Sequence, residues 1–156
     1  MSTKRLKICF AASTGGHFEQ LMMLKPLMEQ HDSFILTEKT DYKTSVGQFP
    51  VFYMTQVNRR ELLFLPKMVV NAFKSLKLYW KEKPDVIICT GVLAMIPMCL
   101  LMKLMRKKLI FIESFAKVSS PTLSGKLLYK YADRFYVQWE EMLQFYPNAI
   151  YKGGIY

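Results

Sequence analysis

Residues 7–21 read Lys7-Ile-Cys-Phe-Ala-Ala-Ser-Thr-Gly-Gly-His-Phe-Glu-Gln-Leu21, and this stretch decides the fold. An apolar run typical of a buried strand ends at two glycines, and apolar residues at helical spacing follow. Glycine can adopt positive φ and lets a ligand approach the backbone, while the N-terminus of the next helix attracts anions. The pattern predicts a strand, a tight turn and a helix, with a phosphate site at Gly15 and Gly16. A glycine turn with a capping histidine is an equally good interpretation of these residues alone.

The rest of the chain repeats this alternation of apolar runs and helical patterns. Strands are predicted at residues 6–12, 33–37, 51–54, 86–89, 109–112, 134–138 and 149–151. Helices are predicted at residues 18–30, 61–83, 92–105, 124–131 and 140–145. Because the strands are almost continuously apolar, they indicate a parallel sheet with helices on both faces. We therefore predict a single Rossmann-like α/β domain over residues 1–156.

Length and charge limit the range of functions. A chain of 156 residues forms one domain with a proper core and is too short for two nucleotide-binding domains. Its net charge of +10 favours anionic partners. No RNA-recognition or zinc-finger signature is present, and the positive charges alternate with long apolar side chains. We therefore expect a phosphorylated ligand or a membrane surface as partner, and no nucleic acid.

Cysteine use and hydropathy indicate a reduced, cytosolic chain. Cys9, Cys89 and Cys99 lie in apolar runs without CxxC spacing, so neither a disulfide framework nor a metal site is expected. No segment reaches the roughly 18 to 20 apolar residues that span a bilayer. The closest segment, residues 92–105, is interrupted by Pro97 and Lys103. A signal peptide at the N-terminus is not expected either.

Polar residues cluster where the predicted strands end, which is where ligands bind in parallel sheets. They occupy residues 13–17, 90–91, 113–120 and 138–139. The first loop is not a dinucleotide fingerprint, because GxGxxG cannot be drawn through it and no acidic residue closes the second strand at Thr37. It also lacks the Gly-Lys-Ser/Thr ending of a Walker A loop. We therefore expect neither an NAD enzyme nor a Walker A nucleotide site.

Three segments carry a resemblance to known glycosyltransferases. Residues 13–17 resemble the glycine-rich acceptor-side loop of MurG-type GT-B enzymes. Residues 112–129, Ile-Glu-Ser-Phe-Ala-Lys-Val-Ser-Ser-Pro-Thr-Leu-Ser-Gly-Lys-Leu-Leu-Tyr, and residues 132–139, Ala-Asp-Arg-Phe-Tyr-Val-Gln-Trp, are similar to the asparagine-linked glycosylation protein fourteen family. More closely, they resemble its bacterial relatives, the PssD-like and EpsE-like subunits of capsule and exopolysaccharide glycosyltransferases. The resemblance covers nearly the whole chain.

This resemblance implies the N-terminal, acceptor-binding half of a two-chain inverting GT-B glycosyltransferase. In that family a second, soluble polypeptide supplies the donor half. A UDP-sugar, galactose or N-acetylglucosamine, would therefore bind mainly to the partner, and this chain would need no cofactor and no metal. The acceptor would be a lipid-diphosphate-linked saccharide. Eukaryotic members carry an N-terminal membrane anchor that this chain lacks, so we expect peripheral attachment at the cytoplasmic, inner face of the cell membrane.

The resemblance and the loop chemistry together suggest roles for individual residues. His17 is the candidate general base that takes the proton from the acceptor hydroxyl, and Glu113 is the alternative base or the group that orients His17. Glu113 as a carboxylate that caps the end of the sheet is the competing interpretation. The residues expected to bind the acceptor and its diphosphate are Ser13, Thr14, Gly15, Gly16, Gly91, Ser114, Lys117 and Ser119.

The helix predicted at residues 61–83 is a candidate for membrane contact. Its apolar side chains alternate with Lys67, Lys74, Lys77 and Lys81, a pattern typical of an amphipathic helix on an anionic lipid surface. Packing of the apolar side on the sheet, with the lysines in solvent, explains the pattern equally well.

The C-terminal tail is the predicted contact with the partner chain. Ile155 and Tyr156 have no obvious place in the core, and they follow two flexible glycines, Gly153 and Gly154. Trp139 is either a loop anchor or a further subunit contact. A frayed terminus is the alternative for the tail.

Two other functions remain open. The chain could be a non-catalytic membrane adaptor that recruits and stabilises the transferase subunit, in which case His17 would be dispensable. It could also be a free-standing enzyme that binds or transfers a sugar phosphate, which would require activity without a partner.

Overall fold

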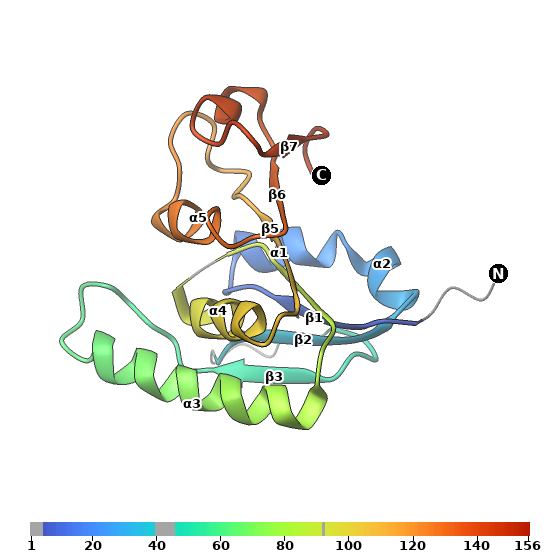
Figure 1. Cartoon of the computed structure of the whole chain (residues 1–156), viewed down its shortest axis with the longest axis vertical. Coiled ribbons are helices and arrows are strands. Elements are labelled where there is room, and N and C mark those ends of the chain that lie inside the picture. The colour runs from blue at the N-terminus through green and yellow to red at the C-terminus, as the bar shows by residue number, and fades with distance from the viewer. Residues whose placement is uncertain (1–4, 40–45, 92) are drawn as a thin grey trace.

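The computed structural model describes residues 5–39, 46–91 and 93–156. These residues form a sheet of seven parallel strands in the order β3-β2-β1-β4-β5-β6-β7 (Figure 1). The strands are β1 (Lys7–Ala11), β2 (Asp32–Glu38), β3 (Val51–Met54), β4 (Val86–Cys89), β5 (Lys108–Ile112), β6 (Arg134–Val137) and β7 (Ile150–Tyr151). The strand order reverses between β1 and β4, so the loops after these two strands meet at the carboxyl edge of the sheet.

Helices cover both faces of the sheet. The helices are α1 (Gly16–Met22), α2 (Lys25–Glu29), α3 (Phe64–Glu82), α4 (Ile96–Leu104) and α5 (Leu123–Leu128), with short 3₁₀ helices η1 (Leu93–Met95) and η2 (Glu140–Gln144). Alternate side chains of β1 enter two cores: Cys9 and Ala11 join the core under α3, α4 and α5, while Ile8 and Phe10 join the core under α1 and α2. The predicted Rossmann-like α/β fold class is confirmed.

Three predicted helices differ in detail from the structure. The helix predicted at residues 18–30 is broken between α1 and α2, and Pro26 explains the break because its ring would clash with the carbonyl of Met22, four residues earlier. The helix predicted at residues 92–105 begins as 3₁₀ turn η1, and Pro97 lies in the first turn of α4. Residues 140–144 are 3₁₀ rather than α-helical.

The longest helix, α3, follows the edge strand β3 and packs beside α4 (Figure 1). Because it connects two parallel strands, it runs antiparallel to them, from the carboxyl edge of the sheet to the opposite edge. Within the described parts of the chain, no helix combines the length and the apolar character needed to cross a membrane.

Candidate active site

The glycine loop leaves the carboxyl end of β1 and enters α1. Gly15 adopts a φ of 70° and precedes the first helical residue, Gly16. Both glycines are exposed, and a Cβ on either would meet no described residue within 4 Å apart from its own neighbours in the chain and the helix backbone. The loop is fixed to the loop after β4 by the N–H of Ser13, which donates to the carbonyl of Gly91 at 3.0 Å. The backbone at Gly15 and Gly16 is therefore accessible from solvent, and its role in binding a ligand stays a prediction.

The imidazole of His17 is held in one orientation by the loop after β4. Its Nδ1 lies 2.8 Å from the carbonyl oxygen of Thr90. Because a carbonyl oxygen can only accept, Nδ1 carries the proton and Nε2 is the nitrogen left to accept one. The hydroxyl of Thr90 in turn donates to the carbonyl of His17 at 2.7 Å.

Gly91 makes room for this histidine. Its φ of 124° is unfavourable for residues with a side chain, and a Cβ at this position would lie 3.0 Å from Nδ1 of His17. Sequence analysis placed Gly91 among the ligand-binding residues. In the structure its carbonyl accepts from Ser13, and its lack of a side chain leaves room for the imidazole of His17.

The electrostatic environment keeps His17 neutral. Burial lowers the pKa of His17 below its ordinary value of 6.5, and the hydrogen bond to Thr90 and the charge of Glu113 oppose this effect only in part. A neutral imidazole with a free Nε2 can accept a proton near pH 7. His17 thus has the protonation state that a general base requires.

Glu113 has a different environment from the one expected for a base. Its side chain lies at the end of β5 and is buried, with 1% of its surface exposed. The carboxylate accepts hydrogen bonds from the hydroxyl of Tyr146 at 2.7 Å, from the hydroxyl and N–H of Thr122, and from the N–H of Ser114. A Cβ at Gly125 would overlap both the Glu113 carboxylate and the Tyr146 hydroxyl.

These contacts favour the second interpretation of Glu113, a carboxylate that caps the end of the sheet. It joins β5 to the N-terminus of α5 and to the segment after η2, and burial together with the adjacent carboxylate raises the pKa of the Tyr146 hydroxyl. Among the described residues, Glu113 influences His17 through its charge, not through a hydrogen bond.

The other predicted acceptor residues follow β5 in one loop. Ser114 is buried, and its carbonyl accepts a hydrogen bond from the N–H of Lys117. Ser119 is exposed further along the same loop. The N–H of Phe115 approaches Oε1 of Gln20 in α1 at 3.5 Å, so this loop lies against the helix that begins at the glycine loop.

A buried pair of glutamines, Gln20 and Gln138, joins α1 to the loops after β5 and β6. Nε2 of Gln138 donates to Oε1 of Gln20 at 3.1 Å and to the carbonyl of Glu113 at 2.8 Å. Oε1 of Gln138 accepts from the N–H of Ile155 at 3.0 Å. From the sequence, Gln138 is identified only as one of the polar residues at the strand ends, and Gln20 is not identified as a functional residue. A polar residue on the buried side of an apolar helical pattern is the signal that could have identified Gln20.

The C-terminal tail corrects the expectation that Ile155 has no place in the core, whereas Tyr156 is exposed. Ile155 packs against the core under α1 and α2, and the Tyr156 ring contacts the Phe115 ring edge-on at 5.1 Å. Trp139 anchors the loop after β5, because its Nε1 donates to the carbonyl of Phe115 in that loop at 2.6 Å.

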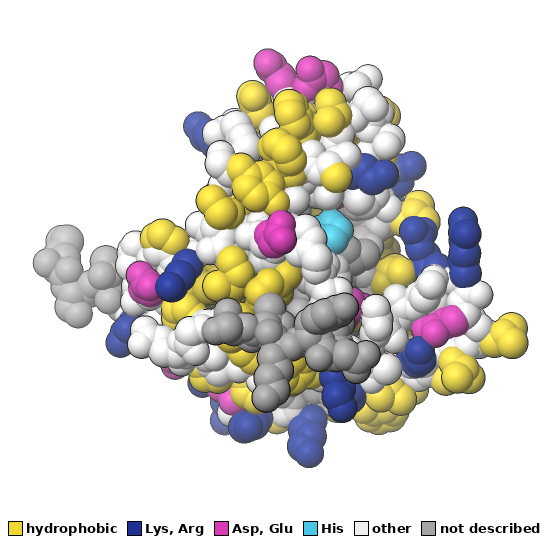
Figure 2. All heavy atoms as spheres, turned by 180° about the vertical axis from the view of Figure 1, so that it is seen from behind, with side chains coloured by type: hydrophobic (Ala, Val, Ile, Leu, Met, Phe, Trp, Pro, Cys, Tyr) yellow, Lys and Arg dark blue, Asp and Glu magenta, His cyan; other side chains and the backbone are white. Residues whose placement is uncertain are grey.

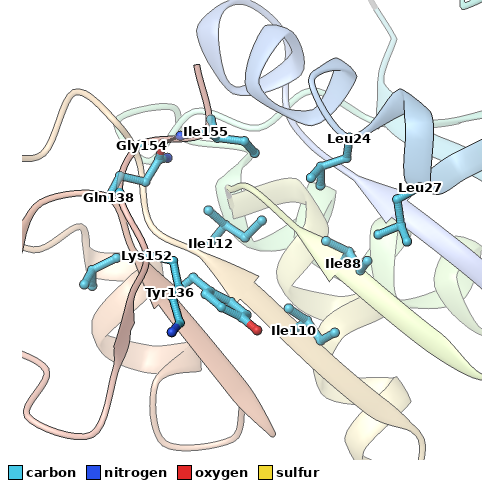
Figure 3. Close-up of a pocket in the computed structure, with 12 residues that line it drawn as sticks. Leu24, Leu27, Ile88, Ile110, Ile112, Tyr136, Gln138, Lys152, Gly154 and Ile155 are labelled. Carbon is cyan, nitrogen blue, oxygen red and sulfur yellow. Dashed lines mark hydrogen bonds between the residues drawn. The ribbon is translucent and has the colours of Figure 1, made fainter.

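The docked tail borders a pocket of about 310 Å³ on the face of α1 and α2 (Figure 3). The sheet supplies an apolar floor from β4, β5 and β6, and Leu24 and Leu27 form the wall on the opposite side from Gly154 and Ile155. Lys152 stands at the tail side of the pocket. The tail is thus a structural part of this face.

Glu38 is a second residue whose position differs from the one predicted from the sequence. The second strand does not end at Thr37 but continues to Glu38, so an acidic residue does close it. The Glu38 carboxylate is buried and accepts hydrogen bonds from the N–H groups of Val57 and Thr14, and burial raises its pKa. It therefore ties the glycine loop to the segment after β3.

The described residues offer no group of three or more His, Cys, Asp or Glu side chains arranged to hold a metal ion. Cys9, Cys89 and Cys99 are buried free thiols. Burial raises the pKa of Cys9, and the hydrogen bond with Cys89 together with burial raises the pKa of Cys99. The chemistry that the site offers is an open glycine backbone beside a neutral, oriented histidine.

Comparison with known sequences gives a family match over most of the chain. Residues 30–155 match the family described as "Oligosaccharide biosynthesis protein Alg14 like". A UDP-N-acetylglucosamine transferase subunit ALG14 from Yarrowia lipolytica is 30% identical, over 94% of this chain and 80% of the relative. The subunit of the same name from Mus musculus is 24% identical, over 96% of this chain and 83% of the relative.

Comparison with solved structures shows the fold. MurG from Acinetobacter baumannii superposes with a TM-score of 0.73 at 16% identity, over 87% of this chain and 42% of that chain. The UDP-N-acetylglucosamine 2-epimerase from Rickettsia bellii superposes with a TM-score of 0.75 at 12% identity, over 97% of this chain and 45% of that chain. The chain therefore spans less than half the length of these structures.

Proposed function

The chain belongs to the Alg14-like family of oligosaccharide biosynthesis proteins, and from this we propose that it is the acceptor-binding subunit of a two-chain glycosyltransferase. The relatives are named as subunits of a UDP-N-acetylglucosamine transferase, which supports a glycosyltransferase subunit here. The fold corresponds to about half of MurG, which supports a second chain for the missing half. That partner would bind the UDP-sugar, with N-acetylglucosamine as the transferred sugar and galactose as the alternative.

The acceptor that we propose is a lipid-diphosphate-linked saccharide. Its diphosphate would lie against the open backbone of Gly15 and Gly16, with the Ser13 and Thr14 hydroxyls as further donors. The resemblance of residues 112–139 to the PssD-like and EpsE-like subunits further supports capsule or exopolysaccharide synthesis as its pathway. Attachment would be peripheral, at the inner face of the cell membrane, where such an acceptor is presented.

One observation carries the chemical part of the proposal: His17 is neutral, with Nδ1 bound to Thr90 and Nε2 available, directly beside the open glycines. Nε2 would take the proton of the acceptor hydroxyl as its oxygen forms a bond to the anomeric carbon of the donor sugar. The bond from that carbon to the UDP oxygen breaks, so that UDP leaves and the configuration inverts. General-base catalysis of this kind contributes about 10² to 10⁴-fold in rate.

The non-catalytic adaptor is the second candidate, and the surface of α3 favours it. This helix exposes large apolar side chains, among them Phe73 and Trp80, which a purely catalytic subunit does not need. In this case the chain would hold the transferase at a membrane, and the partner would supply every catalytic group.

The experiment that tests the proposed function measures sugar transfer from UDP-N-acetylglucosamine and UDP-galactose to a lipid-diphosphate-linked saccharide. The chain is assayed alone, with the candidate donor-binding subunit, and the subunit is assayed alone. We expect transfer only when both chains are present. Equal activity of the partner alone would overturn the acceptor-binding role, and activity of this chain alone would show a free-standing enzyme.

A further inference from the structure

The helix α3 carries two uncharged polar residues on the inside. Asn71 and Ser75 are fully buried toward the sheet. The amide of Asn71 pairs with the backbone of Thr55, accepting from its N–H and donating to its carbonyl at 2.8 Å each, and Ser75 donates to the carbonyl of Asn71 at 2.7 Å. The polar groups on the inner side are thus satisfied within the protein, and α3 does not depend on an entirely apolar inner face.

The outward side of α3 is correspondingly apolar. Large side chains recur at spacings of three and four residues along it, which places them on one side of the helix. Phe73 is 69% exposed and Trp80 is 58% exposed. We call this set the α3 stripe: Leu65, Val69, Phe73, Leu76 and Trp80. Leu62, which is fully exposed just before the helix, adds to it. So large an apolar surface indicates a partner that is itself apolar.

Lysines line the border of the stripe on the side of β3. Lys74, Lys77 and Lys81 surround a pocket of about 240 Å³ together with Phe52 and Tyr53. Within the described residues none of the three lysines forms an ion pair: Lys74 donates to the hydroxyl of Thr55, and Lys81 lies over the Phe52 ring. The part of the chain that the structure describes therefore leaves their positive charge without a carboxylate partner.

Three lysines in the last turn of α4 and just after it differ in this respect. Lys103 and Lys108 pair with Asp133, and Lys107 pairs with Asp85. The three lysines of the pocket therefore leave positive charge directly beside the α3 stripe.

A groove borders the stripe on its other side, between α3 and α4. It has a volume of about 820 Å³ and is lined by Ala72, Leu76, Pro97, Leu100, Leu101, Lys103, Leu104 and Tyr131. Leu104 is 78% exposed at its rim. The outer surface of α3 therefore runs from a row of positive charges, over an apolar stripe, into an apolar groove.

We propose that the α3 stripe docks on a membrane rich in anionic phospholipid, with the lysine pocket at the phosphate headgroups and the α3–α4 groove open to acyl chains. Aromatic and aliphatic side chains bordered by lysines are typical of helices that lie in the membrane interface. The same row of lysines argues against a protein partner, because lysine is depleted in protein interfaces.

The orientation that results fits the acceptor site. Since α3 begins at the carboxyl edge of the sheet, Leu62 and Leu65 lie at the edge that also carries the glycine loop. Docking through the stripe brings that edge to the lipid surface, where a lipid-linked saccharide would be reached. The inference deepens the proposed function by specifying the membrane surface that it uses, and it is tested without acceptor or donor, so that the two can fail separately.

The test is sedimentation of the full chain with vesicles of phosphatidylcholine alone or with one third phosphatidylglycerol. Phe73→Ser/Leu76→Ser should lower the partition coefficient at least ten-fold on the anionic vesicles. Lys74→Gln/Lys77→Gln should lower it about 30-fold on anionic vesicles, since each lysine contributes about 1 kcal/mol, or about five-fold. On neutral vesicles the lysine variant should match the wild type. Salt should weaken the binding of the wild type.

The matched control lies on α5, which also exposes two leucines and bears lysines: Leu123→Ser/Leu127→Ser and Lys126→Gln/Lys130→Gln should bind as the wild type does. Circular dichroism melting shows that each variant is folded, and the lysine variant serves if the apolar one is not. The proposal is overturned if the wild type does not bind anionic vesicles, or if the α5 variants lose binding equally. It is also overturned if the stripe variant binds vesicles normally and loses only the partner subunit, which would make the stripe a protein interface.

Discussion

His17 and Thr90 are joined by two hydrogen bonds that run in opposite directions. The ring Nδ1 of His17 donates to the carbonyl of Thr90, and the hydroxyl of Thr90 donates to the carbonyl of His17. The two residues follow the adjacent parallel strands β1 and β4, between which the strand order reverses. The orientation of the imidazole is thus set by the sheet itself, and this is why we expect its Nε2 to have a chemical role.

Replacing His17 by Ala should lower the turnover of the two-chain complex at least about 100-fold, because a general base is lost. The measurement is the rate of sugar transfer at saturating donor and acceptor. His31→Ala is the control, since the other histidine lies just before β2 at the opposite edge of the sheet. Co-purification with the partner should be unchanged in both variants. Near-wild-type turnover of His17→Ala would favour the adaptor.

The pH dependence of transfer should reflect the lowered pKa of His17. A protonated imidazole cannot act as a base, so kcat/KM should fall on the acidic side with an apparent pKa below 6.5. The same shift acts on stability: the folded chain binds this proton less readily than the unfolded chain, so its contribution to stability is lost as the pH falls below 6.5. An acidic limb centred above 6.5 would contradict the assignment.

Replacing Gly16 by Val should weaken acceptor use and leave the fold intact. Apart from its chain neighbours and the helix backbone, no described residue lies within 4 Å of the added Cβ, so the new side chain causes no clash there but occupies the space that a diphosphate would need. Gly16→Ala should have a smaller effect in the same direction. The comparison is the KM for the lipid-linked acceptor, with the melting temperature as the check on folding. Equal KM values for both variants and the wild type would exclude the diphosphate from this loop.

Glu113→Gln should destabilise the protein by about 1–3 kcal/mol, because an amide nitrogen cannot accept from the donors that surround the buried carboxylate. Urea unfolding measures this free energy. Tyr146→Phe removes one of those donors, and a double-mutant cycle should show coupling between the two positions. At a temperature where Glu113→Gln is folded, its turnover should exceed that of His17→Ala. If the Glu113→Gln protein is stable but its turnover is abolished, Glu113 is the general base instead.

Deletion of residues 153–156 should lower the free energy of unfolding. The N–H of Ile155 satisfies the buried amide of Gln138, and the Ile155 side chain packs against the core. Losing both should cost about 1–2 kcal/mol and lower the melting temperature by roughly 2–8 °C in a chain of this size. Calorimetry of the isolated chain measures the shift.

The tail remains the proposed contact with the partner subunit, and this deletion addresses that role as well. Tyr151 and Tyr156 are exposed, and hydrophobic side chains gather over the upper part of the rear face, at the level of β6 and β7 (Figure 2). The control is Ile155→Ala, which removes core contact while leaving Tyr156. Partner binding that survives the deletion at a temperature where the chain is folded would place the interface elsewhere.

Local patterns were sufficient to predict most of the sheet. The strands Val51–Met54 and Val86–Cys89 were predicted with their observed bounds, because short apolar runs follow Pro50 and Asp85 and end at polar residues. The break between α1 and α2 was not predicted, because the apolar residues keep helical spacing across it. Pro26 is the signal for the break, since a proline at that position disfavours a continuous helix.

The candidate site was predictable only in part, for a physical reason. The glycine loop and His17 are a local motif, so the sequence identified them. The role of Glu113 depends on Thr122 and Tyr146, and the role of Ile155 depends on Gln138. These partners are brought together only when the chain folds, and neither composition nor periodicity records such pairings.

The two edges of the sheet bear on how the chain behaves at high concentration. The edge strand β7 has only two residues, and the opposite edge strand, β3, has four and lies beside Lys74, Lys77 and Lys81. Short strands and nearby lysines hinder the addition of a further strand from another molecule. The architecture thus discourages amyloid-like stacking between copies of this chain at high concentration.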